Sequence, residues 1–235
     1  MAKDASEKQA KFYAKARKEL EKRLTNYRFI HSVSVADTAA AMAKVYGVDV
    51  EKARIAGLLH DWDKNHSDKE LTERARKFGV TISAYEDDMV ALLHAQTGAC
   101  ALAEEFSELS PEVIQAVARH TSAAADMTDL DMVVYIADMI EPLRTRGNLA
   151  TLRELVGKIS LEELFVKSYE ITMKHLVTRH RFIHPDSLDV WNAYIQRERL
   201  NNEQADSKQS ISEQAGSEQE KDQRKNDNND RARKG

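Results

Sequence analysis

The apolar residues of this chain recur mostly three and four positions apart, the spacing that lines one face of an α-helix. No segment shows the strict alternation of apolar and polar residues that predicts a half-buried β-strand. Only three prolines and eight glycines interrupt the pattern. We therefore expect an all-α fold.

Residues that cap helices predict where the individual helices begin and end. A turn at His184 and Pro185 should precede a last helix that ends near Leu200. The expected helix starts are Asp49, Ser67 with Glu70, Ser110 with Pro111, Thr128 with Asp131, and Ser160 with Glu163, and the expected ends are Gly47, Gly79 and about His180.

The chain divides into three parts by composition. Residues 1–23 are highly charged and predict a helix that packs on the following domain or leads into it. Residues 24–200 carry the regular apolar pattern and predict one folded domain. Residues 201–235 are rich in Asn, Gln, Ser and charges of both signs. Because such a segment buries too little apolar surface to offset its ordering entropy, we expect a disordered polar tail.

Composition and charge narrow the classes of function. A chain of 235 residues with 42% hydrophobic content can bury one sizeable core. It contains neither a run of roughly 18 apolar residues nor a signal peptide, so we expect a cytoplasmic protein without a membrane partner. Cys100 is the only cysteine, which excludes an internal disulfide and a thiolate metal cluster. The net charge of −4 provides no broad cationic surface for nucleic acid.

Four polar residues occupy positions where the helical pattern predicts apolar ones: His31, His60, Asp61 and Asp138. A buried imidazole or carboxylate without a partner costs several kcal/mol, and a shared cation would satisfy all four. Imidazole and carboxylate ligands without thiolates suit iron, manganese or cobalt, and leave magnesium and zinc open. Because adjacent helical residues point about 100° apart, His60 and Asp61 can share a site only where their helix ends.

Two further histidines extend this cluster. His94 lies within the apolar segment MVALLHAQTGA, and His120 ends the apolar segment VIQAVARH. Six ligands would hold two divalent metals, with Asp61 bridging both ions. A hydroxide between the metals would be the nucleophile, because paired cations lower the pKa of water and stabilise charge on a phosphoryl group. The residues therefore favour a metal-dependent phosphohydrolase.

The ordered motifs resemble a known family. His31, LLHDWDK and YIADMIEP are similar to the HD superfamily of metal-dependent phosphohydrolases. The fuller segments NYRFIHSVSVADTAAAMAKVYGVDVEKARIAGLLHDWDK, LLHAQTGA, VARHTS, VVYIADMIEPLR and RFIHPDSL resemble the YqeK family of bacterial symmetrical dinucleoside tetraphosphatases. This resemblance runs from about Leu24 to Tyr194. Family members often carry Gly and Lys where this chain has Ala123 and Met132, which changes the expected loop and substrate contacts there.

The resemblance implies a fold, an activity and a set of ligands. It implies an all-helical HD domain over residues 24–200, a di-iron site, and cleavage of diadenosine tetraphosphate into two ADP. Carried over by motif, the metal ligands fall on His31, His60, Asp61, His94, His120 and Asp138.

Several residues near these motifs have a functional and a structural interpretation. Lys64 is expected to assist Asp61 in catalysis by binding a phosphate oxygen, or to form a surface ion pair. Each guanidinium group of Arg28, Arg144 and Arg146 could bind two phosphoryl oxygens of the substrate. The alternative is that these arginines lie at solvated helix ends. Glu141 either orients a ligand histidine or pairs with Arg144. The remaining candidates favour structural roles: Trp62 and Tyr135 in the core, His184 in a turn, and His66, His175 and His180 in solvent.

Two other functions remain open at this point. The metals could act on another nucleotide, such as a guanosine phosphate or a deoxynucleotide. Alternatively, the protein could be a metal-stabilised module that senses nucleotides without hydrolysing them. The full set of expected ligands favours an enzyme. A homodimer is compatible with the sequence.

Overall fold

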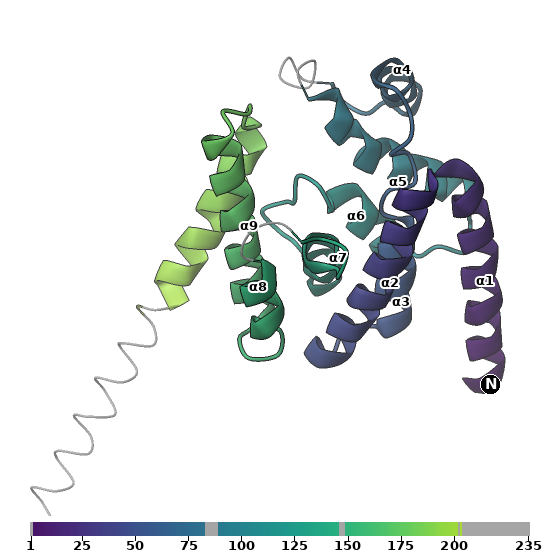
Figure 1. Ribbon diagram of the computed structural model, residues 1–235, viewed down its shortest axis with the longest axis horizontal. Coiled ribbons are helices and arrows are strands. Elements are labelled where there is room, and N and C mark those ends of the chain that lie inside the picture. The colour runs from purple at the N-terminus through teal and green to yellow at the C-terminus, as the bar shows by residue number, and fades with distance from the viewer. Residues whose placement is uncertain (1, 83–88, 146–148, 202, 204–235) are drawn as a thin grey trace, which may run out of the picture. The chain divides into compact units, whose positions relative to one another are not determined.

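The structure, a computed structural model, describes residues 2–82, 89–145, 149–201 and 203, with side chains from residue 7 onward (Figure 1). Within these residues every regular element is helical, which confirms the all-α fold. The elements are α1 (Ala2–Arg23), α2 (Asn26–Tyr46), α3 (Val50–Leu59), α4 (Asp68–Phe78), the short 3₁₀ helix η1 (Val90–Leu92), α5 (Leu93–Glu105), α6 (Pro111–Arg119), α7 (Asp129–Ile140), α8 (Leu149–Leu155) and α9 (Leu161–Thr178).

By their contacts, the described residues divide into two units, one that ends at Trp191 and one that begins at Asn192. Residues 185–191 of the first unit and 192–201 of the second are helical. The predicted tail, residues 201–235, lies outside the described residues apart from Asn201 and Glu203. No helix in the described part of the chain has the length and apolar character that a bilayer span requires.

Most of the predicted helix boundaries are present as capping contacts. Asp49 accepts hydrogen bonds from the first turn of α3, and Gly47 ends α2 with φ +73°. Capping boxes open α4 at Ser67 and α7 at Thr128. Ser110 differs from the prediction, because its side chain makes no capping hydrogen bond although α6 begins at Pro111. The proline itself removes one of the unpaired N–H groups at that helix end.

Helix α7 organises the first unit. It packs against α2, α3, α6, α8 and α9, and most of its side chains are buried (Figure 1). This explains why its sequence, DLDMVVYIADMI, is apolar at most positions and not only along one stripe. Because α7 is surrounded, the carboxylate of Asp138 near its end lies close to residues from several other helices.

Helices α2 and α3 approach each other closely at Gly57. A Cβ atom at this position would lie 3.0 Å from the Ala36 Cα and 3.1 Å from the Val35 carbonyl oxygen. Both are backbone atoms and cannot rotate away. The glycine therefore lets α3 pack directly on α2, which brings the His60 end of one helix beside His31 of the other.

We expect Gly57→Ala to lower the free energy of unfolding by about 1–3 kcal/mol, because overpacking forces the two helix backbones apart. Chemical denaturation of both proteins measures the difference. Gly98→Ala is the matched control: its Cβ would meet its nearest atoms at 3.5 Å, an ordinary contact, so this helical Ala should be neutral or stabilising by up to about 1 kcal/mol. Equal effects of the two substitutions would show that the α2–α3 contact is not constrained.

Candidate metal centre

Three of the expected ligand histidines are held in the same way. In His60, His94 and His120, the ring Nδ1 lies 2.8, 2.5 and 2.7 Å from the carbonyl oxygen three residues earlier. A carbonyl only accepts, so each Nδ1 carries the proton and each Nε2 keeps a free lone pair. His60 and His120 directly follow α3 and α6, and His94 opens α5. All three side chains are buried, with their orientation fixed by backbone.

Asp61 lies among these Nε2 atoms. Its Oδ1 is 3.1 Å from the Nε2 of His94 and 3.7 Å from that of His120, and its Oδ2 is 3.6 Å from the Nε2 of His60. The helix ends at Leu59, so the backbone turns between His60 and Asp61. This is the helix end that the sequence requires if both residues are to reach one site.

His31 and Asp138 complete the cluster from α2 and α7. The His31 Nε2 lies 2.9 Å from the Asp138 Oδ1, and the same oxygen is 3.7 Å from the His60 Nε2. Two groups could each hold a metal ion, since one ligand atom per residue lies within 4.8 Å of the others. The groups are His31, His60 and Asp61, and Asp61, His94 and His120. Asp61 belongs to both, and Asp138 borders the first.

The unpaired Nε2 of His60 tests whether a metal fits. This atom is fully buried and has no hydrogen-bond partner among the described residues. Burial lowers the pKa of His60 to about 4, so the ring is neutral and its lone pair is available. A buried polar atom without a partner destabilises the fold, whereas coordination to a cation would satisfy it. The donor set therefore fits a divalent metal.

The negative charges of Asp61 and Asp138 are consistent with the binding of a divalent metal. Burial alone would raise the pKa of Asp61, but His60, His120 and His94 hold it well below its usual value. Burial would also raise the pKa of Asp138, but the hydrogen bond from His31, together with His60 and Arg144 nearby, lowers it below its usual value. Both carboxylates are thus anions in a buried site, beside the neutral ring of His60. Such a site attracts cations.

Glu141 fixes the orientation of His31. Its Oε1 accepts from the His31 Nδ1 at 3.0 Å, and its Oε2 accepts from the Ser34 hydroxyl and the Leu143 amide, each at 2.7 Å. The side chain is fully buried. Of the two roles that the sequence left open for Glu141, orienting His31 has the shorter contact, because Arg144 lies 4.0 Å away. Burial would lower the pKa of His31, but the carboxylates of Asp138 and Glu141 outweigh this effect and raise it.

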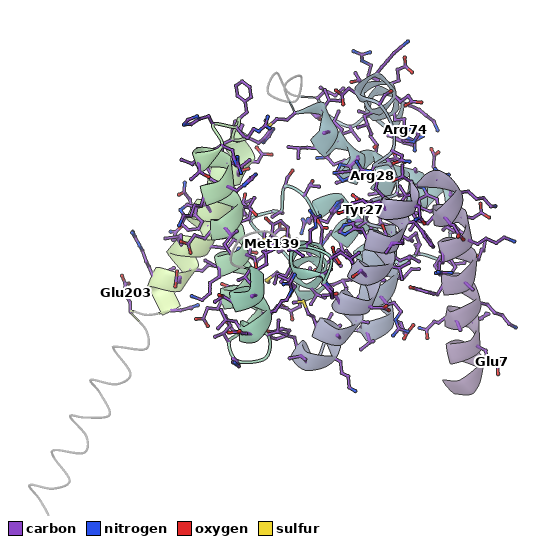
Figure 2. The ribbon with its side chains drawn as sticks, viewed as in Figure 1. Glu7, Tyr27, Arg28, Arg74, Met139 and Glu203 are labelled. Atoms are coloured by element: carbon purple, nitrogen blue, oxygen red, sulfur yellow. The ribbon has the colours of Figure 1, made fainter. Side chains whose placement is uncertain are left out.

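Two arginines hold the segments that carry these residues. Figure 2 labels Arg74 on α4. Its side chain donates two hydrogen bonds, of 2.7 and 2.9 Å, to the buried carboxylate of Asp63 and so anchors the turn that follows His60. Arg153 donates to the carbonyls of Ile140 and Glu141 at 2.6 and 2.9 Å, which fixes the end of α7. Neither arginine is identifiable from the sequence, because each contact spans more than ten residues.

The expected phosphate-binding residues surround the same cluster. The Lys64 Nζ lies 4.0 Å from the Asp61 Oδ1 and 3.2 Å from the His94 Nε2, and burial lowers its pKa. The Arg28 Nη1 is 3.9 Å from the Asp61 Oδ2, and Arg144 donates to the Asp138 Oδ1 at 2.7 Å. Arg146 lies outside the described residues. Three of the four expected cations therefore lie beside the carboxylates.

A cavity of about 880 Å³ opens beside the cluster, with Asp138, His120 and Arg144 in its wall. Tyr27 and Met139 also line it (Figure 2). His175 lines it as well, although the sequence suggested only solvation for this residue, because the end of α9 lies beside α7. The volume falls in the range of about 300–1,000 Å³ that is usual for small-molecule sites.

The other aromatic and histidine candidates have structural contacts. Trp62 is buried and packs edge-to-face on Phe106 at 5.5 Å, and Tyr135 is buried with its hydroxyl 3.0 Å from that of Thr172. His184 accepts from the Asp186 amide, which agrees with a turn. His66 lies 3.6 Å from Asp63.

Comparisons with known proteins agree with this arrangement. Residues 28–143 match the HD domain family. The symmetrical bis(5′-nucleosyl)-tetraphosphatase of Halalkalibacterium halodurans is 31% identical over 178 residues, or 75% of this chain and 93% of the relative. Its counterpart in Bacillus subtilis is 30% identical over 74% of this chain and 92% of the relative. The chain belongs to the symmetrical bis(5′-nucleosyl)-tetraphosphatase family of HD-domain proteins.

A solved structure has the same fold as this family member. A predicted HD superfamily hydrolase involved in NAD metabolism, from Clostridium acetobutylicum, superposes with a TM-score of 0.75 at 30% identity. The match covers 79% of this chain and 97% of that protein. HD membership, together with the His and Asp groups described above, indicates divalent metal binding in this chain.

In this family member we expect Glu141→Gln to weaken metal binding by about 10–100-fold. Three donors point at the carboxylate, and an amide offers them only one acceptor oxygen. Competition for manganese(II) against a chromophoric chelator measures the affinity. Glu154→Gln, the same change at an exposed position of α8, should leave it unchanged. An unaltered affinity in both variants would refute the positioning role of Glu141.

Proposed function

We propose that the protein hydrolyses dinucleoside tetraphosphates symmetrically, converting diadenosine tetraphosphate and one water into two ADP. The observation that carries the proposal is the convergence of two carboxylates and four imidazoles on one buried site beside a cavity. The relatives in Halalkalibacterium halodurans and Bacillus subtilis, which bear the name of this activity, support the choice of substrate.

The site is proposed to hold two divalent ions. His31, His60 and Asp138 would hold one ion, His94 and His120 the other, and Asp61 both. Ring nitrogens with carboxylate oxygens suit iron first, with manganese or cobalt as alternatives. When bound, such ions lower the pKa of water and stabilise negative charge on a phosphoryl group.

The protein's own residues position the substrate. Lys64, Arg28 and Arg144, with Arg146, are proposed to bind the phosphate oxygens, because they bring positive charge to the rim of an anionic site. Arg144 also donates to Asp138 and so joins a proposed phosphate contact to a proposed metal ligand. The bond that breaks is one P–O bond of the bridge between the two central phosphorus atoms. The bridging oxygen leaves with one ADP, and water supplies the new terminal phosphate oxygen of the other ADP.

The two alternative functions make different demands on the same site. A phosphohydrolase acting on a guanosine phosphate or a deoxynucleotide would use the same metal ligands but require other contacts to the base. A sensing module would bind metal and nucleotide without turnover. The orphaned Nε2 of His60 favours a metal in every case, so only products distinguish the three.

With manganese(II) or iron(II) under reducing conditions, we expect diadenosine tetraphosphate to yield ADP as the sole nucleotide product. Liquid chromatography of the reaction mixture measures the products. A panel of guanosine tetraphosphate, deoxyguanosine triphosphate and NAD tests the alternative substrates, NAD because of the solved structural neighbour. Formation of AMP and ATP would contradict symmetrical cleavage. Faster turnover of another compound in the panel would assign that compound as the substrate instead.

Asp61→Ala provides the test of the site. We expect loss of hydrolysis to background, because the substitution removes the carboxylate common to both ligand groups. Asp37→Ala, an exposed aspartate of α2, is the control and should retain full activity. Comparable activity in the two variants would contradict the proposed centre.

A further inference from the structure

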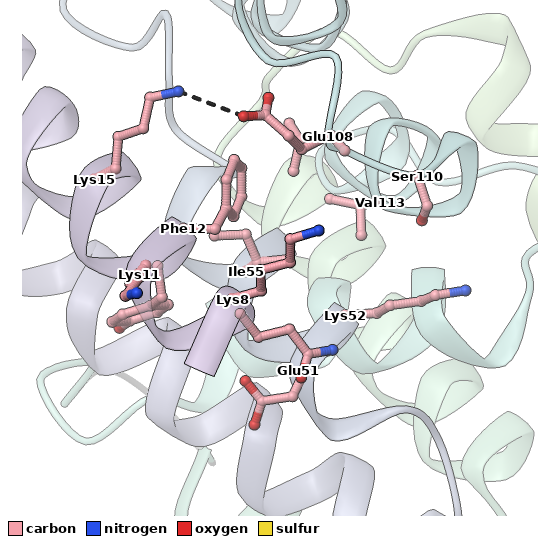
Figure 3. Close-up of a pocket in the computed structure, with 13 residues that line it drawn as sticks. Lys8, Lys11, Phe12, Lys15, Glu51, Lys52, Ile55, Glu108, Ser110 and Val113 are labelled. Atoms are coloured by element: carbon pink, nitrogen blue, oxygen red, sulfur yellow. Dashed lines mark ion pairs between the residues drawn. The ribbon is translucent and has the colours of Figure 1, made fainter. Parts of the chain in front are cut away.

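A second concave site lies away from the metal centre. Helix α1 crosses the first turn of α3 and the residues that precede α6, and between them is a groove of about 580 Å³ (Figure 3). Glu51, Lys52 and Ile55 line it from α3, and Ser110 and Val113 from the start of α6. The same two helices carry His60 and His120 at their other ends, so the groove and the metal centre share no residue.

The floor of the groove is apolar and rigid. Ile55 and Val113 are buried side chains, and Leu109 lies beside them. Phe12 of α1 forms one wall, where its ring is held edge-to-face against Phe106 at a centroid distance of 5.7 Å. A ligand with a flat apolar group would therefore contact a preformed surface.

The rim of the groove is positively charged. Four lysines and two glutamates line it, although the chain as a whole has a net charge of −4. Lys15 pairs with Glu108 at 3.5 Å (Figure 3). Lys52 pairs with Glu112 at 3.2 Å. Lys8 and Lys11 make no ion pair with any residue whose side chain is described. Their two ammonium groups add positive charge to the rim of the groove.

From this geometry we propose that the groove is a second ligand site, which takes a small amphiphilic anion, an aromatic or branched apolar group carrying a phosphate or carboxylate. The apolar part would cover Phe12, Ile55 and Val113, and the anionic group would lie between Lys8 and Lys11. The volume is that of a small-molecule site, and the charge of the rim selects an anion.

The probe is 8-anilinonaphthalene-1-sulfonate, an aromatic anion that fluoresces in apolar sites, titrated into the metal-loaded full-length protein. We expect Lys11→Glu to weaken saturable binding by about fivefold or more, because an attraction becomes a repulsion. Lys18→Glu is the matched control: it makes the same charge change on the same helix at an exposed residue outside the groove. It should change the affinity less than twofold.

Competition identifies the anionic group. Displacement of the probe by 1-naphthyl phosphate more than by 1-naphthoate assigns a phosphate ligand, and the reverse order assigns a carboxylate. Both variants should keep their melting temperature and full tetraphosphate hydrolysis, so this test is independent of the proposed activity. Equal effects of Lys11→Glu and Lys18→Glu, or displacement by inorganic phosphate as strongly as by the aromatic anions, would overturn the proposal.

Discussion

The arrangement depends on one hydrogen bond repeated three times. In His60, His94 and His120 the ring Nδ1 donates to the carbonyl three residues earlier, so the backbone of each local turn sets the direction of the ring. Each Nε2 then faces a buried space that also contains the carboxylate of Asp61. Buried imidazoles and carboxylates are unfavourable unless they satisfy one another or share an ion. The centre is therefore a cost to the fold and, in the proposed function, the source of the protein's chemistry.

The surrounding fold provides rigidity for this centre. Gly57 permits the close packing of α2 on α3, and α7 lies among the helices that contribute the other residues of the cluster. Asp63 with Arg74 anchors the turn after His60, while Arg153 fixes the end of α7. Since polar side chains in a buried site keep their geometry only when neighbouring contacts hold them, these distant arginines belong to the site as much as the histidines do.

The sequence predicted the parts of this structure that depend on local chemistry. Capping boxes at Ser67 and Thr128 and the glycine end of α2 are contacts within four residues, so their residue types identify them. Histidines and aspartates indicated the candidate centre for another reason, because they occupy positions where the helical pattern predicts apolar residues. Ser110 was expected to cap α6 and does not, because a capping residue type does not fix its rotamer.

Long-range contacts could not be predicted in this way. Arg74 resembles any surface arginine, and only the fold shows that it pairs with a buried aspartate eleven residues away. The same holds for His175, which lines the cavity because α9 packs on α7. Glu141 was recognised as a candidate, but the choice between His31 and Arg144 as its partner required the distances from its carboxylate to both side chains.

The central claim is that ligands from separate helices converge on a pair of cations. Anomalous scattering at the metal absorption edge, from crystals of the metal-loaded protein, measures this directly. Two peaks per chain are expected, one among His31, His60 and Asp138 and the other beside His94 and His120, with Asp61 contacting both. A single peak, or peaks remote from Asp61, would contradict the account.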